Sequence, residues 1–234
     1  MKKHKLLYGV IVILLALISY FVYPGGDEPH RGIGADALGN VIDIAGTFAG
    51  EAYVTINDNI PFFDVDYTLT NSYEEYYEQD ALGRCTGAEA LIGEDLMPNE
   101  ERGAIGHVKP SGWQTVKYSF VDGKYLYNRC HLIGYQLTGE NANRNNLITG
   151  TRYLNVDGML PFENMVADYI RETGNHVMYR VTPLYKEDNL LASGVVMEAM
   201  SIEDKGDGIC FNVYCYNAQP GVAIDYATGE SLEE

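Results

Sequence analysis

Basic side chains are scarce in this sequence, which has 16 lysines and arginines against 33 aspartates and glutamates and a formal net charge of −17. This balance argues against a protein that coats nucleic acid or an anionic membrane through its bulk charge. Glycine and proline, at 25 and 8 of 234 residues, are too few for a fibrous or low-complexity chain. Hydrophobic residues make up 46% of the chain, which excludes a wholly disordered protein and predicts one folded domain plus an appendage.

Cysteines are also few, and the four in the chain show no Cys-x-x-Cys or paired Cys/His spacing. A structural zinc site therefore has little support. Cys210 and Cys215 lie in an alternating run, so they would point to opposite faces of a strand, about 16 Å apart. That separation is too large for a disulfide between them. We expect the thiols to behave as small buried apolar groups, although an exported domain permits disulfides.

A long uncharged run stands near the N-terminus, where residues 6–23 follow Lys2, Lys3 and Lys5. As a helix this run would be about 27 Å long, close to the thickness of the hydrocarbon layer. Because basic flanks favour the inner side, the rest of the chain would lie outside the membrane. We predict a transmembrane anchor over residues 1–24. Secretion after signal cleavage is the alternative, although residues 20–26 lack the small-residue cleavage pattern.

The stretch after the anchor, residues 25–47, carries glycines among charged neighbours and shows no apolar periodicity. This composition is typical of a flexible tether. We therefore expect the folded domain to occupy residues 48–234.

Within that domain the pattern is mixed and predicts an α+β fold. Alternating runs on either side of Asp122-Gly123, residues 114–121 and 124–130, predict a hairpin. After Pro161 an apolar helical stripe begins and Gly174 ends it. We expect further extended segments at residues 52–56, 61–67, 176–183, 194–200 and around Cys210, and a short helix at residues 71–80.

Positive charge is concentrated in one part of this acidic chain. Residues 102–152 contain seven basic and two acidic residues, a net charge of +5, whereas the rest of the exported part has a net charge of −25. A local cationic groove could guide a phosphodiester substrate, while the acidic remainder disfavours loose coating along a polymer. Scattered solvated charges would account for part of the contrast.

The segment Asn128-Arg129-Cys130-His131, followed by Leu-Ile-Gly, resembles the Asp-Arg-Gly-His signature of the DNA/RNA non-specific endonucleases. The resemblance continues through residues 143–155 to Glu163 and is greatest to the DNA-entry nuclease branch. It implies a ββα-metal (His-Me finger) nuclease fold, in which an antiparallel sheet accompanies a prominent helix carrying or following the metal ligand. We therefore predict this fold, preceded by an N-terminal membrane helix.

The resemblance implies that His131 is the general base. Neutral imidazole near pH 7 can take a proton from water as the oxygen approaches phosphorus. A lone histidine is more often structural, and we interpret His107, His176 and His30 in that way.

Asn155 matches the metal-binding asparagine of the family, which offers one amide oxygen to a hydrated Mg²⁺. Mn²⁺ or another hard divalent cation would serve the same purpose. The alternative is a helix-capping asparagine. Glu163 matches a carboxylate that helps to hold the waters of the metal. Because Gly158 and Pro161 disfavour an unbroken helix from Asn155, Glu163 could instead be a charge favoured by the helix dipole.

Arg129 matches the arginine of the motif, whose planar guanidinium suits two phosphate oxygens, and surface ion pairing is its alternative. Lys117, Asn128, Arg144 and Arg152 are further candidates for substrate binding, with solvated charge as the alternative for the three cations. Trp113 and the nearby tyrosines could stack on bases or simply pack.

Two residues depart from the signature, since Asn128 replaces the usual aspartate and Cys130 the usual glycine. The loss of a carboxylate could weaken the orientation of the imidazole or alter its pKa. A thiol nucleophile beside His131 is disfavoured because neighbouring strand residues point to opposite faces.

We therefore expect a membrane-anchored, Mg²⁺-dependent endonuclease that cuts DNA and RNA without sequence preference and has no obligate protein partner. Contacts to phosphates and sugars, which all sequences share, would explain that tolerance. A surface receptor that binds nucleic acid without cutting it is the alternative. The sequence leaves open a role in nutrient scavenging, DNA uptake or attack.

Overall fold

The computed structural model describes residues 35–234, and the predicted anchor over residues 6–23 lies outside this part of the chain. Among the described residues, no helix combines the length and apolar character needed to cross a membrane.

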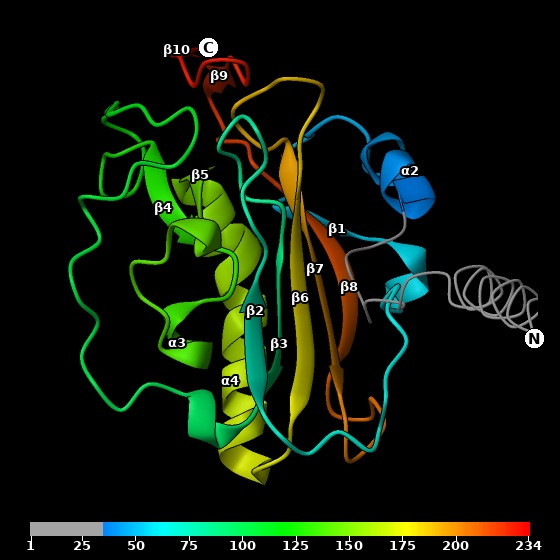
Figure 1. The fold of residues 1–234 in the computed structure, drawn as a ribbon. Helices are drawn as coiled ribbons and strands as arrows, with labels where there is room; N and C mark the ends of the chain where they lie inside the picture. The colour runs from blue at the N-terminus through cyan, green and yellow to red at the C-terminus, as the bar shows by residue number, and fades with distance from the viewer. Residues whose placement is uncertain (1–34) are drawn as a thin grey trace, which may run out of the picture. The chain divides into compact units, whose positions relative to one another are not determined.

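A six-stranded sheet forms the centre of the described domain (Figure 1). Its order is β1-β8-β7-β6-β3-β2, and every neighbouring pair is antiparallel. The strands are β1 (Tyr53–Thr55), β2 (Tyr73–Tyr76), β3 (Ala88–Ile92), β6 (Val177–Leu184), β7 (Gly194–Ser201) and β8 (Cys210–Tyr216). An antiparallel sheet with separate helices confirms the predicted α+β class.

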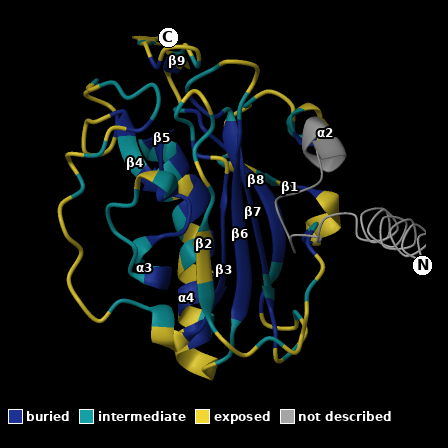
Figure 2. Cartoon of the chain, viewed as in Figure 1, coloured by how far each residue is buried: buried dark blue, intermediate teal, exposed yellow. Residues whose placement is uncertain are grey.

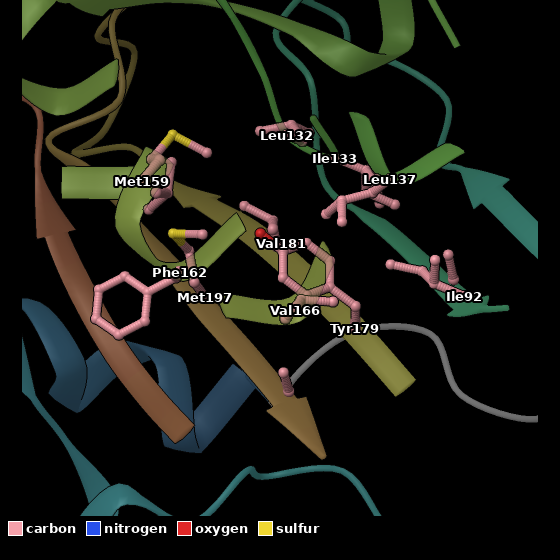
Figure 3. Packing of buried hydrophobic residues seen from close by; sticks show 14 of the residues in the cluster. Ile92, Leu132, Ile133, Leu137, Met159, Phe162, Val166, Tyr179, Val181 and Met197 are labelled. Carbon is pink, nitrogen blue, oxygen red and sulfur yellow. The ribbon is translucent and has the colours of Figure 1, made fainter. Parts of the chain in front are cut away.

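The central strands are buried along nearly their whole length, because both faces of the sheet are covered (Figure 2). On one face, Phe162 and Val166 of helix α4 (Leu160–Thr173) pack with Tyr179 and Met197 of the sheet (Figure 3). On the other face, Val41 of helix α2 (Ala35–Ala45) packs with strand residues of β6, β7 and β8. A fully buried leucine-sized side chain contributes about 1.5–3 kcal/mol, so these two clusters hold the layers together.

A smaller ββα unit is attached to the α4 side of the sheet. Strands β4 (Tyr127–His131) and β5 (Leu147–Thr151) form an antiparallel pair, and the chain passes from β5 directly into the helix that becomes α4. Between the two strands lie the short helix α3 (Tyr135–Thr138) and the 3₁₀ turn η3 (Arg144–Asn146). A second pair, β9 (Val222–Ile224) and β10 (Ser231–Glu233), lies near the C-terminus, and single 3₁₀ turns occur at η1 (Asn57–Asn59) and η2 (Glu94–Leu96).

Three predicted elements are wrong. Residues 71–80 contain strand β2 rather than a helix, because Tyr73 and Tyr76 pair with β3 at the sheet edge. The predicted hairpin at residues 114–130 is reduced to one bridge, Lys117 with Tyr125, and residues 127–131 pair with β5 instead. A two-residue hairpin turn would need positive φ at Asp122 and Gly123, whereas the positive φ angles fall on Gly123 and Lys124. Residues 61–67 also lack a strand.

The stretch predicted to be a tether contains helix α2, so regular structure begins before residue 48. Gly46, with φ +69°, ends this helix, and its N–H donates to the carbonyl of Ile42 at 3.0 Å. The glycines of this stretch favour a tether, whereas the contact of Val41 with the sheet stabilises the helix.

The helix after β5 is continuous, contrary to the expected break at Pro161. Residues 154–159 form the π-helical turn η4, and the Leu160 N–H donates to the carbonyl of Asn155, five residues earlier. Pro161 lies in the first turn of α4, where a missing N–H costs little. In a π turn each N–H bonds to the carbonyl five residues earlier. The carbonyl four residues before Pro161 therefore does not take its α-helical position, in which the proline ring would clash with it. As predicted, Gly174 ends α4 with φ +70°.

Candidate active site

A polar hollow of about 560 Å³ lies where β4 meets the start of the π turn. Its lining combines cations, amides and aromatic rings: Arg102, Ile105, Trp113, Thr115, Tyr125, Tyr127, Asn128, Arg129, Arg152 and Asn155. Four of these residues, Asn128, Arg129, Arg152 and Asn155, were predicted from the motif. The structure therefore brings half of the eight predicted site residues into one lining, while His131, Glu163, Lys117 and Arg144 lie outside it.

His131 ends β4 and is 6% exposed. Its Nε2 lies 2.8 Å from the carbonyl oxygen of Asn141, and because a carbonyl only accepts, Nε2 must carry the proton. Nδ1 is then the basic nitrogen, and it accepts from the guanidinium of Arg102 at 3.2 Å. Burial lowers the pKa of His131 to about 4, assisted by the cation of Arg102, although the bond to Asn141 opposes the shift. The ring is neutral at physiological pH.

Arg102 is a site residue that the motif did not reveal. It lines the hollow together with Asn155 and also contacts Nδ1 of His131, so one guanidinium connects the two halves of the predicted site. The only sequence signal for this residue is its place at the start of the positively charged stretch. Its distance of 29 residues from His131 gives no local pattern.

Asn155 stands in the first turn of η4 with its side chain at the hollow. Among the described residues, no side-chain hydrogen bond involves its carboxamide. π turns are frequent at functional sites. A partly buried amide left free beside a polar hollow can offer its oxygen to a ligand.

Glu163 lies one helical segment further along, in the first turn of α4. Its carboxylate fits against Gly134, where a Cβ would lie only 2.6 Å from Oε2. Burial raises the pKa of Glu163 to about 7, against smaller lowering effects of Gln136 and Arg102. The carboxylate is therefore within electrostatic reach of the same guanidinium that contacts His131.

Arg129 shares a strand face with His131, two residues away. Its NH2 donates to the carbonyl of Gly106 at 2.8 Å, its Nε donates to the carbonyl of Val108, and its guanidinium stacks 3.9 Å from the Trp113 ring. Arg129 thus fixes the 105–110 loop against β4 while it lines the hollow. No surface ion pair involves it among the described residues.

The three weaker cationic candidates lie in different places. Arg152 lines the hollow and pairs with Asp122 at 2.7 Å. Lys117 lies over the Tyr125 ring at 4.4 Å, beside the hollow rather than in its lining. Arg144 lines a different hollow with His107 and Lys109. Of the aromatic candidates, Trp113, Tyr125 and Tyr127 are in the lining.

The two departures from the signature have structural correlates. Cys130 points away from His131 into the core and is fully buried, and a Cβ on Gly150 of the facing strand would collide with its Sγ. The thiol of Cys130 is thus accommodated because Gly150 has no side chain. Burial raises the pKa of this thiol well above the usual range. Asn128 Nδ2 is buried without a partner.

All four cysteines lie in the described part of the chain as free thiols, and three are buried. The expectation of buried thiols is confirmed for Cys85, Cys130 and Cys215, whereas Cys210 is only partly buried.

Two buried asparagines fix the position of β5. Asn146 accepts from the Ile133 N–H at 2.9 Å and donates to the Ile133 carbonyl at 3.0 Å. Asn217 accepts from the Thr151 N–H at 2.8 Å and donates to the Thr149 carbonyl at 3.1 Å. An amide that pairs with a backbone N–H and C=O replaces a missing strand neighbour, so both ends of β5 are held rigidly.

The donor set suits a hard cation held loosely. Among residues 35–234, no group of three or more His, Cys, Asp or Glu side chains could enclose a metal ion. The free oxygen of Asn155 is the kind of ligand that Mg²⁺ accepts beside several waters.

Comparison with known proteins agrees with this geometry. A family model described as DNA/RNA non-specific endonuclease matches residues 65–203, more than half of the chain. The chain belongs to this family.

Three solved structures are similar to the chain. NucA from Streptococcus agalactiae with magnesium bound is 26% identical, with 77% of this chain and 86% of that chain covered and a TM-score of 0.69. The same protein with no metal bound is 25% identical, with coverage of 85% and 95% and a TM-score of 0.70. Sda1 nuclease with bound zinc is 26% identical, with coverage of 79% and 97% and a TM-score of 0.67. The protein is accordingly a nuclease, an enzyme that hydrolyses phosphodiester bonds.

Proposed function

We propose that this protein is a divalent-metal-dependent endonuclease that cleaves DNA and RNA without sequence preference, with His131 as general base. The observation that carries the proposal is the neutral imidazole of His131, with Nε2 bound to Asn141 and Nδ1 directed to Arg102 of the polar hollow. The hollow presents cations and amides rather than a pattern of groups suited to one base, and phosphate contacts carry no sequence information.

In this proposal, Nδ1 of His131 takes a proton from a water molecule whose oxygen attacks phosphorus. Arg102 occupies Nδ1 in the structure, so its guanidinium must leave before water can bind there. An anionic phosphate oxygen in the hollow would attract Arg102 more strongly than neutral imidazole does, because the pair would then be charge-assisted. Substrate binding would therefore free the base and place a cation on the phosphate in one movement.

Asn155 would hold the cation through its side-chain oxygen, and Glu163 would orient the waters around it. When bound, the cation stabilises negative charge on the phosphoryl group and on the departing 3′ oxygen. The magnesium and zinc in the NucA and Sda1 structures support a divalent ion, and the oxygen donor favours Mg²⁺. Arg129, Arg152 and Asn128, which line the hollow, would bind phosphate, with Lys117 beside them over the Tyr125 ring.

We further propose that residues 6–23 anchor the enzyme with its catalytic domain outside the membrane. The support is the uncharged run after three lysines. Treatment of intact cells with a protease would remove the domain if this orientation is right, and its protection would contradict the orientation.

The test of the chemistry is relaxation of supercoiled plasmid by the purified full chain, with Mg²⁺ or with EDTA. We expect cleavage with Mg²⁺ alone. His131→Ala should lower the rate by about 10²–10⁴-fold, the usual contribution of a general base. His176→Ala is the matched control and should retain the wild-type rate, because His176 pairs with Glu203 and does not line the hollow. Binding of DNA without cleavage in any divalent metal would support the receptor alternative instead.

A further inference from the structure

A second hollow, of about 360 Å³, is lined by residues 107–110 of the loop whose Ile105 lines the first hollow. Its lining includes three basic residues, His107, Lys109 and Arg144, together with Gln79 and Ala142. No acidic residue contributes to this lining. In a chain with a net charge of −17, such a concentration of basic groups points to an anionic ligand.

The cations of this hollow are free of acidic partners. Within the described part of the chain, neither Lys109 nor Arg144 forms a salt bridge, whereas Arg84, Arg171 and Arg180 each pair with a carboxylate. The nearby Asp80 is held by Arg84 at 2.7 Å and by backbone N–H groups, so its charge is already neutralised.

Arg144 is held in place while most of its donors remain available. Its Nε donates to the side-chain oxygen of Gln79 at 3.1 Å, and the Gln79 amide donates back to the Arg144 carbonyl at 2.9 Å. The two terminal nitrogens of the guanidinium have no partner among the described residues. A planar fork fixed at its base and open at its tip is well suited to two phosphate oxygens.

Two loops connect this hollow to the catalytic one. Ile105 lines the catalytic hollow and Val108 lines the second, and Arg129 binds the carbonyl of Val108. On the other side, the carbonyl of Asn141 accepts from His131, and the next residue, Ala142, lines the second hollow. The same two loops therefore contribute to both sites, so one extended ligand could contact both.

We propose that the second hollow binds another phosphate of the same nucleic acid strand, next to the scissile linkage, through Lys109 and Arg144. This inference rests on the proposed function, because it assigns a further part of the footprint of the same substrate. The enzyme would thus grip a strand at two separate phosphates, one in each hollow.

The test compares a double variant, Lys109→Gln with Arg144→Gln, with a control of equal charge change, Lys186→Gln with Lys205→Gln. Lys186 and Lys205 line neither hollow. Binding of a labelled single-stranded oligonucleotide is measured by fluorescence anisotropy in EDTA over a range of salt concentrations. For two lost phosphate contacts, the slope of log K against log salt should become shallower by about 1.4, since each contact contributes about 0.7 on a single strand. The control should keep a slope closer to that of the wild type.

Kinetics provide the second readout. The ratio of kcat/KM for the oligonucleotide to kcat/KM for bis(p-nitrophenyl) phosphate should fall about tenfold in the double variant, because the small diester cannot reach both hollows. The control should keep the wild-type ratio. Equal slopes and equal ratios in the two double variants would overturn the inference. A second outcome would also overturn the inference. Inorganic phosphate at constant ionic strength would reduce oligonucleotide binding through Lys109 and Arg144, while the salt slope of the double variant stayed at the wild-type value. The hollow would then bind free phosphate.

The two proposals fail in distinguishable ways. If the wild type binds the oligonucleotide but never cleaves it, the proposed function fails, and the salt slopes still decide the second phosphate site. If the wild type cleaves and the two double variants have equal slopes and equal ratios, only the second site is refuted.

Discussion

The imidazole of His131 should stay neutral far below the pH at which a solvated histidine becomes charged. Its pKa is lowered from 6.5 to about 4, chiefly by burial and further by the cation of Arg102. At about pH 5, roughly nine-tenths of such rings are neutral, compared with about 3% for an ordinary histidine. If His131 is the base, the difference amounts to about 30-fold in rate at this pH.

The same shift affects stability with a definite sign. Because the folded state holds the ring neutral while the unfolded chain takes up a proton near pH 6.5, the stabilising contribution is present above pH 6.5. It is lost as the pH falls through about 4. The loss is about 3 kcal/mol over that interval, since one pKa unit corresponds to about 1.4 kcal/mol.

The direct assay is an NMR titration of the histidine ring carbons in the metal-free enzyme, with His131→Ala to assign the resonance. The His131 signal should stay constant from about pH 8 to pH 5.5, through the range in which solvated histidines titrate. Arg102→Met should raise the midpoint, because a nearby cation is removed. A wild-type midpoint between about 6 and 7 would refute the reasoning, and so would a midpoint that Arg102→Met lowers.

Three other predictions concern the fold. Arg180→Met should lower the free energy of unfolding in urea by about 3–5 kcal/mol, because it leaves the fully buried carboxylate of Glu198 unpaired; a loss below 1 kcal/mol would contradict this. Gly150→Ala should cost about 1–3 kcal/mol by collision with Cys130, and the cost should largely disappear in the background of Cys130→Gly, a coupling that a double-mutant cycle measures. In the native protein, a thiol reagent should label Cys210 alone, since the other three thiols are buried, and fast labelling of a second thiol would disprove that packing.

The elements that the sequence predicts well are those whose pattern is local and strong. The helix after Pro161 has an apolar stripe and a glycine stop, and the strands over residues 177–184, 194–201 and 210–216 are long apolar runs. Residues 71–80 contain strand β2 because they pair with β3, and no local sequence pattern predicts this pairing. The helix through Asn155 was missed because a π turn changes the bonding register before Pro161, which helix rules based on α geometry do not anticipate.

The motif selects His131, Arg129 and Asn155 as candidates, because these residues lie in short segments of recognisable order. The structure places Arg129 and Asn155 in the lining of the polar hollow and joins His131 to it through Arg102. The motif does not identify Arg102, which reaches Nδ1 of His131 from a separate loop. It also does not show that Arg144 lines a different hollow from Arg129 and Asn155. Both positions depend on how the loops fold back. The exchange of glycine for Cys130 became intelligible only through Gly150 on the facing strand.

The stack between Arg129 and Trp113 gives the enzyme a built-in optical probe. Trp113 is the sole tryptophan of the chain, so emission excited selectively from indole reports on one location. A nucleobase that enters beside the ring, or a guanidinium that moves away from it, would alter that emission without any attached dye. Occupancy of the cleft can thus be followed during turnover in the native polypeptide.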